Sequence, residues 1–265
     1  MANLNKDYVL IKINDKRLRT QQKIESDLKS FTRHYVECID GHNEEAVKKF
    51  FKNNINIKER RPMRAGYLGH WLTFLNILKY IVDNDIDNLL VLEDDAILSE
   101  TFIQDLEMYV FHVPDDCDFL MIYDSAPNSD NYLFSKKDVN LRVPQRVKIS
   151  EDMNKIHSDW DIGSDYIVRT YQRFGSVGQV FFNSGAKKII KLTEQNGLGK
   201  SRWEGKAFDM TMYQYSFDGL INGYQPNPKH HLNKMVKIEE TIKGTSNETQ
   251  IQLTKSIDLE KLLEI

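Results

Sequence analysis

Residues 88–95, Asn-Leu-Leu-Val-Leu-Glu-Asp-Asp, decide the fold. The first part is an unbroken run of leucine and valine, which is typical of a strand buried on both faces. Three carboxylates follow at once, Glu93, Asp94 and Asp95. Like charges this close raise one another's pKa values, and a hard divalent cation would relieve the repulsion. Because ligands bind beyond the carboxyl ends of strands in open α/β sheets, the triplet predicts a ligand site, with a solvated polar turn as the alternative.

Apolar runs separated by helical patterns fill the first half of the chain. This alternation predicts an α/β doubly wound sheet that opens with a parallel strand–helix–strand unit. The predicted strands cover residues 8–13, 35–39, 89–92 and 118–123, and the predicted helices cover 14–31, 44–51, 65–82 and 102–110.

The regular pattern dissolves between residues 126 and 178, which predicts an insertion or a functional loop. A strand at 179–182 restores the order, and residues 257–265 have the pattern of a terminal helix. The sequence contains no repeat and no internal linker, so a single domain over residues 1–265 is expected. The acceptor is expected at 126–178, and residues 234–265 form a C-terminal extension.

Composition indicates an ordinary globular protein, with 40% hydrophobic residues and a formal net charge of −3. This charge gives no overall attraction to nucleic acid or anionic lipid. Two cysteines, Cys38 and Cys117, do not suggest a secreted disulfide scaffold. The N-terminus lacks the apolar core of a signal peptide, and no stretch approaches the ~20 apolar residues of a membrane span. A cytoplasmic location without an obligate protein partner is therefore expected.

Six short segments carry a more specific signal. They are Ile11-Lys12-Ile13-Asn14 with Arg19, Cys38-Ile39-Asp40-Gly41, Gly66 to Phe74, Leu92-Glu93-Asp94-Asp95, Ser184-Gly185-Ala186-Lys187-Lys188, and Ala207-Phe208-Asp209. In this order and spacing they resemble the motifs of glycosyltransferase family 25, which covers bacterial lipooligosaccharide and collagen galactosyltransferases. Departures at Lys12, Tyr67 and Thr73-Phe74 flank the expected site, and they bear on the acceptor more than on the donor.

The resemblance implies a GT-A-type nucleotide-binding sheet flanked by helices. It implies a nucleoside-diphosphate sugar as donor, most simply a UDP-sugar, and Mn²⁺ or Mg²⁺ as the metal. Asp95 is then the metal ligand, while Glu93 and Asp94 contact the ribose or base or act through water. Lys12 and Arg19, near the end of the first strand, are candidates for the diphosphate. The alternative for Arg19 is a charge on a helix surface.

The family is classed as inverting, so a carboxylate should deprotonate the acceptor hydroxyl during hexosyl or pentosyl transfer. Asp209 is the first candidate for this base, because it matches a family motif. Asp124, at the carboxyl end of a predicted strand, is the second. One late histidine, His231, is a candidate for completing the metal site. The alternatives are an exposed helix acid for Asp209 and a surface histidine for His231.

Two acceptor classes remain open. A glycan acceptor, as in bacterial surface lipooligosaccharide synthesis, is the first interpretation, and a hydroxylated DNA base such as hydroxymethylcytosine is the alternative. Cations interleaved with aromatic rings would suit DNA, although the acids in the same segment would repel phosphate, and sugars also stack on aromatic rings. A catalytically inactive binding module is a third class, which the intact acidic motif disfavours. The residues concerned are Arg142, Arg146, Lys148, Trp160, Tyr166, Arg169, Tyr171, Arg173 and Phe174, with the acids Asp152, Asp159, Asp161 and Asp165.

Overall fold

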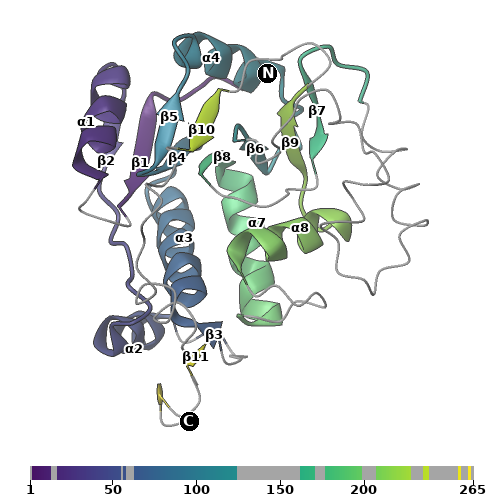
Figure 1. Cartoon of the computed structure of the whole chain (residues 1–265). Helices are drawn as coiled ribbons and strands as arrows, with labels where there is room; N and C mark the ends of the chain where they lie inside the picture. The colour runs from purple at the N-terminus through teal and green to yellow at the C-terminus, as the bar shows by residue number, and fades with distance from the viewer. Residues whose placement is uncertain are drawn as a thin grey trace, which may run out of the picture.

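The structure is a computed structural model that describes residues 2–12, 17–54, 56–57, 63–123, 162–170, 177–198, 207–227, 235–238, 256–257 and 262–263. Figure 1 shows the elements in their spatial arrangement. In chain order they are β1 (Asp7–Ile11), α1 (Leu18–Asp27), β2 (Thr32–His34), α2 (Glu44–Asn53), β3 (Met63–Arg64), α3 (Ala65–Asp83), β4 (Asn88–Glu93), β5 (Ala96–Leu98), α4 (Phe102–His112), β6 (Phe119–Met121), β7 (Ile167–Thr170), β8 (Gly178–Phe182), α7 (Asn183–Asn196), α8 (Phe208–Phe217), β9 (Gly223–Pro226), β10 (Val236–Ile238) and β11 (Ser256–Ile257).

A seven-stranded sheet in the order β2-β1-β4-β8-β6-β9-β7 forms the centre of the fold. Strand β1 pairs in parallel with both β2 and β4, as the opening strand–helix–strand unit predicts. Strand β8 lies antiparallel between β4 and β6, and β7 lies antiparallel to β9, so the sheet is mixed. The predicted α/β sheet flanked by helices is confirmed, but a fully parallel sheet is not found. An apolar run marks a buried strand without specifying its direction.

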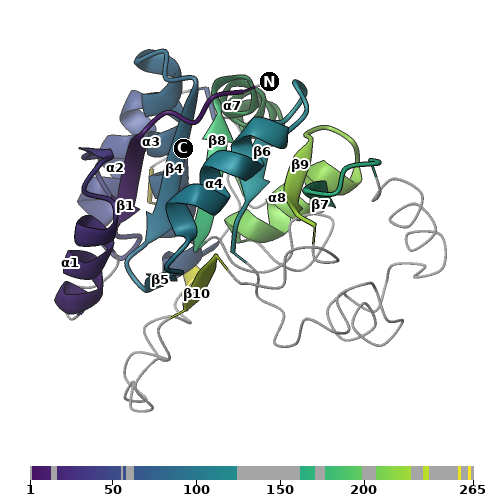
Figure 2. The same cartoon turned by 90° about the horizontal axis from the view of Figure 1, so that it is seen from above.

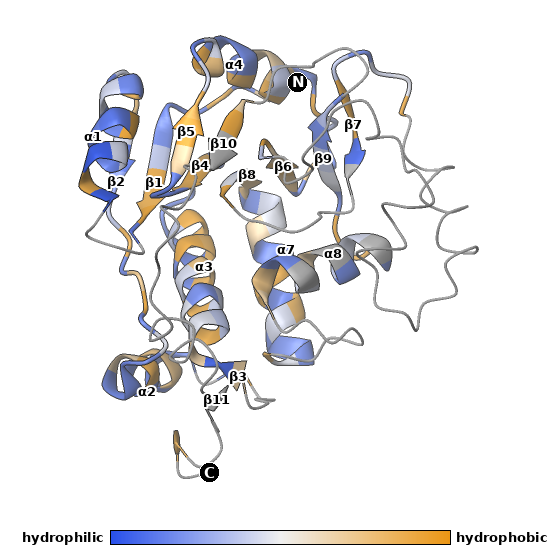
Figure 3. Ribbon diagram, viewed as in Figure 1, coloured by the Kyte–Doolittle hydropathy of each residue, from blue (hydrophilic) through white to orange (hydrophobic). Residues whose placement is uncertain are grey.

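Helices cover both faces of this sheet (Figures 1 and 2). Helices α2, α3, α7 and α8 pack on one face, and α1 and α4 pack on the other. Along β4, Leu89 and Val91 belong to the α3 side, whereas Leu90 and Leu92 belong to the α1 side. All four are completely buried. This two-sided burial explains why the four inner residues of β4 are all apolar (Figure 3).

The second strand is shorter and earlier than predicted. Strand β2 covers Thr32–His34, whereas the predicted strand at 35–39 is not a strand. The ring of His34 lies 2.8 Å from Asp7 Oδ1 and 2.9 Å from the hydroxyl of Tyr80. Tyr35, the next residue, is 79% exposed, which shows that the chain leaves the sheet there. The apolar residues that predicted a strand at 35–39 instead lead the chain toward α3.

The segment after β2 crosses the first half of α3 at very short range. A Cβ atom on Gly41 would lie 1.9 Å from the carbonyl oxygen of Ala65, and one on Gly69 would lie 2.5 Å from that of Ile39. The Ile39 N–H also donates a 2.9 Å hydrogen bond to Thr73 Oγ1. Only glycine permits this approach, so the two glycines fix where α3 lies against the chain.

The C-terminal part contributes to the same core. Strand β10 pairs with β5, and Val236 is fully buried. At Ile257 the structure has strand β11, which pairs with β3, in place of the start of the predicted terminal helix. Within the described ranges, no helix is both long enough and apolar enough to cross a membrane.

Candidate active site at the carboxyl end of β4

The three acids lie where β4 ends. Glu93 is the last residue of β4, and β5 begins at Ala96. Because successive side chains of a strand point to opposite faces, Glu93 follows Val91 toward the α3 side. Asp94 is fully buried and contacts Arg17, the N-cap of α1, and Gln21 of α1 on the opposite side. We call Glu93, Asp94 and Asp95 the acid end.

An arginine neutralises part of this charge. Arg17 Nη1 lies 3.0 Å from Asp94 Oδ1 and 3.0 Å from Asp95 Oδ2. Gln21, one helical turn later, donates a 3.4 Å hydrogen bond to Asp94 Oδ2. Burial alone would lower the pKa of Arg17, but the charge of Asp95 and the contact with Asp94 outweigh it and raise that pKa. The guanidinium therefore stays charged.

Asp95 is incompletely satisfied. Its Oδ1 atom is buried and has no hydrogen-bond partner among the residues that the structure describes. Burial raises the pKa of Asp95, the charge of Glu93 adds to the rise, and Arg17 opposes it. A buried carboxylate oxygen without a partner is uncommon in proteins and calls for an explanation, such as an ion.

A divalent cation fits this oxygen. No three His, Cys, Asp or Glu side chains of the described residues are grouped as a complete metal site. Cations such as Mg²⁺ are commonly held by one or two carboxylates, with phosphate oxygens and waters completing the shell. Asp95 suits that pattern, because the protein would supply few ligands and a diphosphate the others.

A histidine and an aromatic cluster connect the acid end to α8. His70 Nε2 on α3 lies 3.3 Å from Glu93 Oε1. The His70 ring meets Phe74 and Phe208 edge-on, at centroid distances of 4.8 and 6.1 Å. Phe74 stacks on Phe208 at 4.2 Å with an interplanar angle of 14°. These rings fix the start of α8, where Asp209 occupies the first turn.

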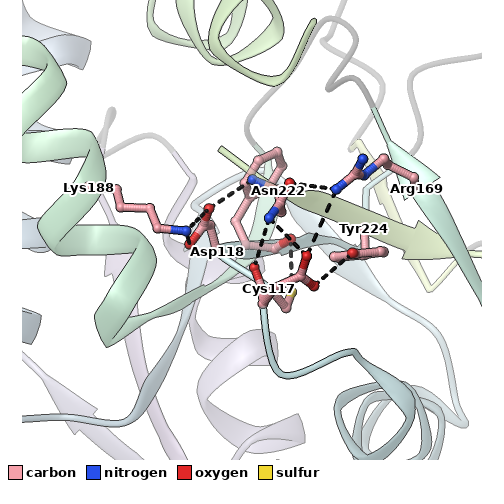
Figure 4. Close-up of polar contacts among 8 residues, drawn as sticks. Cys117, Asp118, Arg169, Lys188, Asn222 and Tyr224 are labelled. Carbon is pink, nitrogen blue, oxygen red and sulfur yellow. Dashed lines mark hydrogen bonds and ion pairs between the residues drawn. The ribbon is translucent and has the colours of Figure 1, made fainter. Parts of the chain in front are cut away.

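A second polar cluster lies just before β6 and β9, at the end of these strands opposite to the acid end. Figure 4 shows its contacts. Asp118 is fully buried, and Lys188 Nζ lies 2.9 Å from its Oδ1 and 3.0 Å from its Oδ2. The backbone N–H of Asn222 donates to Asp118 Oδ2 at 2.8 Å. We call this cluster the amino-end network, and its members are Asp116, Asp118, Arg169, Lys188, Asn222 and Tyr224.

The rest of the amino-end network ties three strands together (Figure 4). The hydroxyl of Tyr224 and the side-chain amide of Asn222 each donate a 2.9 Å hydrogen bond to Asp116. Arg169 of β7 donates to the side chain of Asn222. Burial and the hydrogen bond to Asp116 raise the pKa of Tyr224. Asp118 Oδ1 accepts no hydrogen bond among the described residues, but it lies 2.9 Å from the charged Lys188 Nζ. Each acid of the cluster therefore has a polar or charged partner within it, which indicates a structural role.

Comparison with known proteins identifies the family. The family model described as "Glycosyltransferase family 25 (LPS biosynthesis protein)" matches residues 8–212. The chain belongs to glycosyltransferase family 25. A relative from Acanthamoeba polyphaga mimivirus, named "Procollagen lysyl hydroxylase and glycosyltransferase", is 28% identical over 97 residues. The match covers 33% of this chain and 11% of that protein, so the chain spans a small part of its relative's length.

The motif-based prediction of family 25 is thus confirmed, and the mixed sheet is consistent with a GT-A-like fold. The motif segments have distinct structural roles. Segments 38–41 and 66–74 make the close crossing at α3, and segment 92–95 forms the acid end. In the late motif, a Cβ atom on Gly185 would lie 2.1 Å from the carbonyl oxygen of Asp118, so this glycine is required for packing.

The predicted site residues of this family 25 member fall into four groups. Glu93, Asp94 and Asp95 lie together at the acid end. Lys12 and Arg19 are exposed, the first just after β1 and the second on α1. Asp209 lies on α8, beside the ring that packs against His70. Asp124 and His231 lie outside the described residues, and the structure does not test the role of any of these residues.

Sequence reasoning missed Arg17 and His70. Arg17 stands two residues before Arg19 in the same basic run, so spacing from β1 allowed either arginine. The two arginines lie on different sides of a helix with 3.6 residues per turn. Which of them faces the acids therefore depends on the residue at which α1 begins. His70 lies within the motif segment 66–74. Its contact with Glu93 could not be predicted, because that contact depends on how α3 crosses β4.

Proposed function

We propose that this chain is a metal-dependent glycosyltransferase that moves a sugar from a nucleoside-diphosphate sugar, most simply a UDP-sugar, to a glycan hydroxyl. The observation that carries this proposal is the buried Oδ1 of Asp95 at the carboxyl end of β4, which has no hydrogen-bond partner within the described part of the chain. Family membership supports transferase activity, and the position matches where ligands bind in α/β sheets. The proposal includes an inverting mechanism with a hexose or pentose as the transferred group.

In this proposal Asp95 holds Mn²⁺ or Mg²⁺, and Glu93 and Asp94 orient the ribose or base of the donor. The cation would offset the negative charge that develops on the diphosphate as the sugar bond breaks. Lys12 and Arg19 remain candidates for the diphosphate, and His231 for a further metal ligand. The contact between His70 and Glu93 supports the orientation of that carboxylate.

Asp209 is the proposed base. Its place on α8 is held by the packing of Phe208 against Phe74 and Trp71. In the proposed step the Asp209 carboxylate accepts the proton of the acceptor hydroxyl as that oxygen attacks the sugar carbon and the diphosphate leaves. Asp124 is the second candidate for the same role.

A glycan acceptor is favoured over DNA by one contact. Arg169, which the DNA interpretation needs as a phosphate ligand, donates to Asn222 and lies 3.9 Å from Asp116 Oδ2. This engagement removes one cation from the surface that DNA would require. A glycan acceptor of the lipooligosaccharide type has no such requirement. We also propose a cytoplasmic location, which the free cysteines Cys38 and Cys117 support.

A panel of nucleotide sugars tests the activity. Each donor is incubated with Mn²⁺ and an acceptor, and release of the nucleoside diphosphate is measured. The acceptors are an oligosaccharide, hydroxymethylated duplex DNA and, because of the mimivirus relative's name, a procollagen peptide with hydroxylysine. Metal-dependent release with one donor supports the proposal, and no release with any donor contradicts it.

Salt dependence distinguishes the first two acceptors. DNA binding should weaken steeply with salt, and Arg173→Ala should flatten the slope by roughly one unit if that residue contacts phosphate. A glycan site should be insensitive to salt, and Trp160→Ala should then lower transfer more than Arg173→Ala does. If binding to the duplex weakens steeply with salt and the enzyme modifies hydroxymethylated DNA, the acceptor is DNA and the proposal of a glycan acceptor is wrong.

A further inference from the structure

Arg17 holds two of the three carboxylates of the acid end with one nitrogen. Its Nη1 lies 3.0 Å from Asp94 Oδ1 and 3.0 Å from Asp95 Oδ2. Asp94 is fully buried, so this contact supplies charge where water does not reach. Removing such a cation from buried carboxylates without a replacement is strongly unfavourable.

One of the two carboxylates that Arg17 contacts is Asp95, the carboxylate on which a divalent cation is proposed to bind. Mg²⁺ sits about 2.0–2.1 Å from its oxygen ligands, so a cation on Asp95 would be a close neighbour of the guanidinium in its present position. Two positive groups this close repel each other, and they compete for the same lone pairs. Because Asp95 Oδ1 accepts no hydrogen bond from any residue that the structure describes, Arg17 satisfies the site only in part.

The position of Arg17 would allow its guanidinium to leave the carboxylates and bind a phosphate. Its side chain is one quarter exposed, and it stands at the N-cap of α1, where no side chain caps the helix. A guanidinium matches the geometry of a phosphate as well as that of a carboxylate. A diphosphate bound beside Asp95 would therefore offer Arg17 an alternative partner at a short distance.

We propose that Arg17 couples metal binding to donor binding. In the metal-free protein its guanidinium supplies, beside Asp95, the positive charge that the divalent cation would supply, and it transfers to the diphosphate when donor and cation bind together. The inference rests on the proposed metal-dependent function. It follows that Mn²⁺ alone binds weakly and that UDP strengthens Mn²⁺ binding, with Mn²⁺ strengthening UDP binding by the same factor.

Mn²⁺ binding to the full chain, measured by the electron paramagnetic resonance signal of free Mn²⁺, tests this inference. The variants are Arg17→Gln, which removes the charge, and Arg17→Lys, which keeps the charge without the planar fork. Lys23→Met is the matched control, because it removes one positive charge from the same helix at an exposed residue whose partner is Asp27. Each protein is titrated with Mn²⁺ alone and with Mn²⁺ in saturating UDP.

Arg17→Gln should bind Mn²⁺ alone roughly 10-fold more tightly than the wild type, and UDP should improve its Mn²⁺ affinity much less. Arg17→Lys should still bind Mn²⁺ alone weakly but should lose most of the strengthening by UDP. Lys23→Met should match the wild type in both titrations. If Arg17→Gln fails to fold, as thermal unfolding would show, Arg17→Lys alone decides through the loss of the UDP effect.

Unchanged or weaker binding of Mn²⁺ alone to folded Arg17→Gln would overturn the inference. So would a UDP effect in Arg17→Lys equal to that of the wild type. If the wild type binds Mn²⁺ with UDP while the Arg17 variants behave identically, the inference fails and the proposed function stands. If no protein binds Mn²⁺ with or without UDP, metal dependence fails and the inference fails with it.

Discussion

The acid end and the amino-end network lie at opposite ends of the parallel strands of one sheet. In both, a buried aspartate lies beside a positively charged side chain, Arg17 at the acid end and Lys188 in the amino-end network. In the amino-end network, Asp118 Oδ2 accepts hydrogen bonds from Lys188 and from the Asn222 N–H, and Asp118 Oδ1, although it accepts no hydrogen bond among the described residues, lies 2.9 Å from the charged Lys188 Nζ. At the acid end, Asp94 and Asp95 share one guanidinium nitrogen, and Asp95 Oδ1 lacks a hydrogen-bond partner among the described residues.

This difference distinguishes a cluster whose acids are paired with cations of the protein from the proposed ligand site. A buried polar network whose members satisfy one another stabilises the fold and leaves nothing for a ligand. A buried carboxylate that remains incompletely satisfied makes the empty protein less stable than it could be, and a bound cation can recover that stability. The same substitution at the two ends should therefore have opposite effects on activity and stability.

The largest effect is expected on activity at the acid end. Asp95→Ala should lower sugar transfer by roughly 10³-fold or more, because the variant loses the electrostatic stabilisation of the leaving diphosphate. The thermal unfolding midpoint should stay close to that of the wild type. A chelator should reproduce the loss in the wild-type enzyme, measured as nucleotide release. Full activity in chelator would remove the metal from the mechanism.

Asp209→Asn tests whether the catalytic site extends to α8. If Asp209 accepts the proton of the acceptor hydroxyl, the variant should lose roughly 10²-fold in turnover with little change in donor affinity. Steady-state kinetics with varied donor and acceptor measure both quantities. Near-normal turnover would transfer the role to Asp124 and leave Asp209 as a structural residue.

Asp118→Asn should affect stability instead of turnover. The substitution removes the charge that Lys188 pairs with, and because Lys188 is half exposed the loss should be modest, about 1–3 kcal/mol in the free energy of unfolding. Asp95→Asn should be neutral or stabilising at neutral pH, since burial raises the pKa of this carboxyl and disfavours its charge. Urea unfolding of both variants measures the contrast. A larger loss of unfolding free energy in Asp95→Asn than in Asp118→Asn would contradict this expectation.

The smallest effect concerns the two cysteines, one near each end. Burial raises the pKa of Cys38, and the charge of Asp94 adds to that rise although the Lys12 backbone opposes it. Burial raises the pKa of Cys117 well above its ordinary value, and the charges of Asp118 and Asp116 add to it. Both shifts slow alkylation, but Cys38 is partly exposed whereas Cys117 is buried. Cys38 should therefore react slowly with an alkylating reagent in the native protein, whereas Cys117 should react only on unfolding.

Mass spectrometry of the alkylated protein over time gives both rates. Asp118→Asn should speed the labelling of Cys117 and leave that of Cys38 unchanged. Faster labelling of Cys117 than of Cys38 in the native wild type would mean that the amino-end network opens more readily than the acid end.

Sequence patterns predicted the helices and strands whose formation depends on residues close together in the chain. The apolar run before Glu93 predicted β4, and the helical stripe from residue 65 predicted α3, which ends at Asp83. The direction of β8 was not predictable, because burial on both faces is compatible with either direction. The strand expected at 35–39 was wrong, since apolar residues there pack against α3 and not within the sheet.

The candidate site shows the same limit. The acid end was predicted because its three residues are consecutive, and its location at the end of β4 followed from that strand. Arg17 could not be chosen over Arg19, because a shift of one residue in the start of α1 changes which arginine faces the acids. The amino-end network was missed because Asp118 lies 70 residues from Lys188 and 104 from Asn222, with no local pattern linking them.

The most direct test of the contrast between the two ends is calorimetric titration of UDP in the presence of Mn²⁺, on the wild type, Asp95→Asn and Asp118→Asn. All three proteins are measured at a temperature where each is folded. Asp118→Asn should bind Mn²⁺ and UDP within about twofold of the wild type, and Asp95→Asn should lose roughly 10-fold or more in affinity. Wild-type affinity in Asp95→Asn, or a loss confined to Asp118→Asn, would contradict the assignment of the metal and donor site to the acid end.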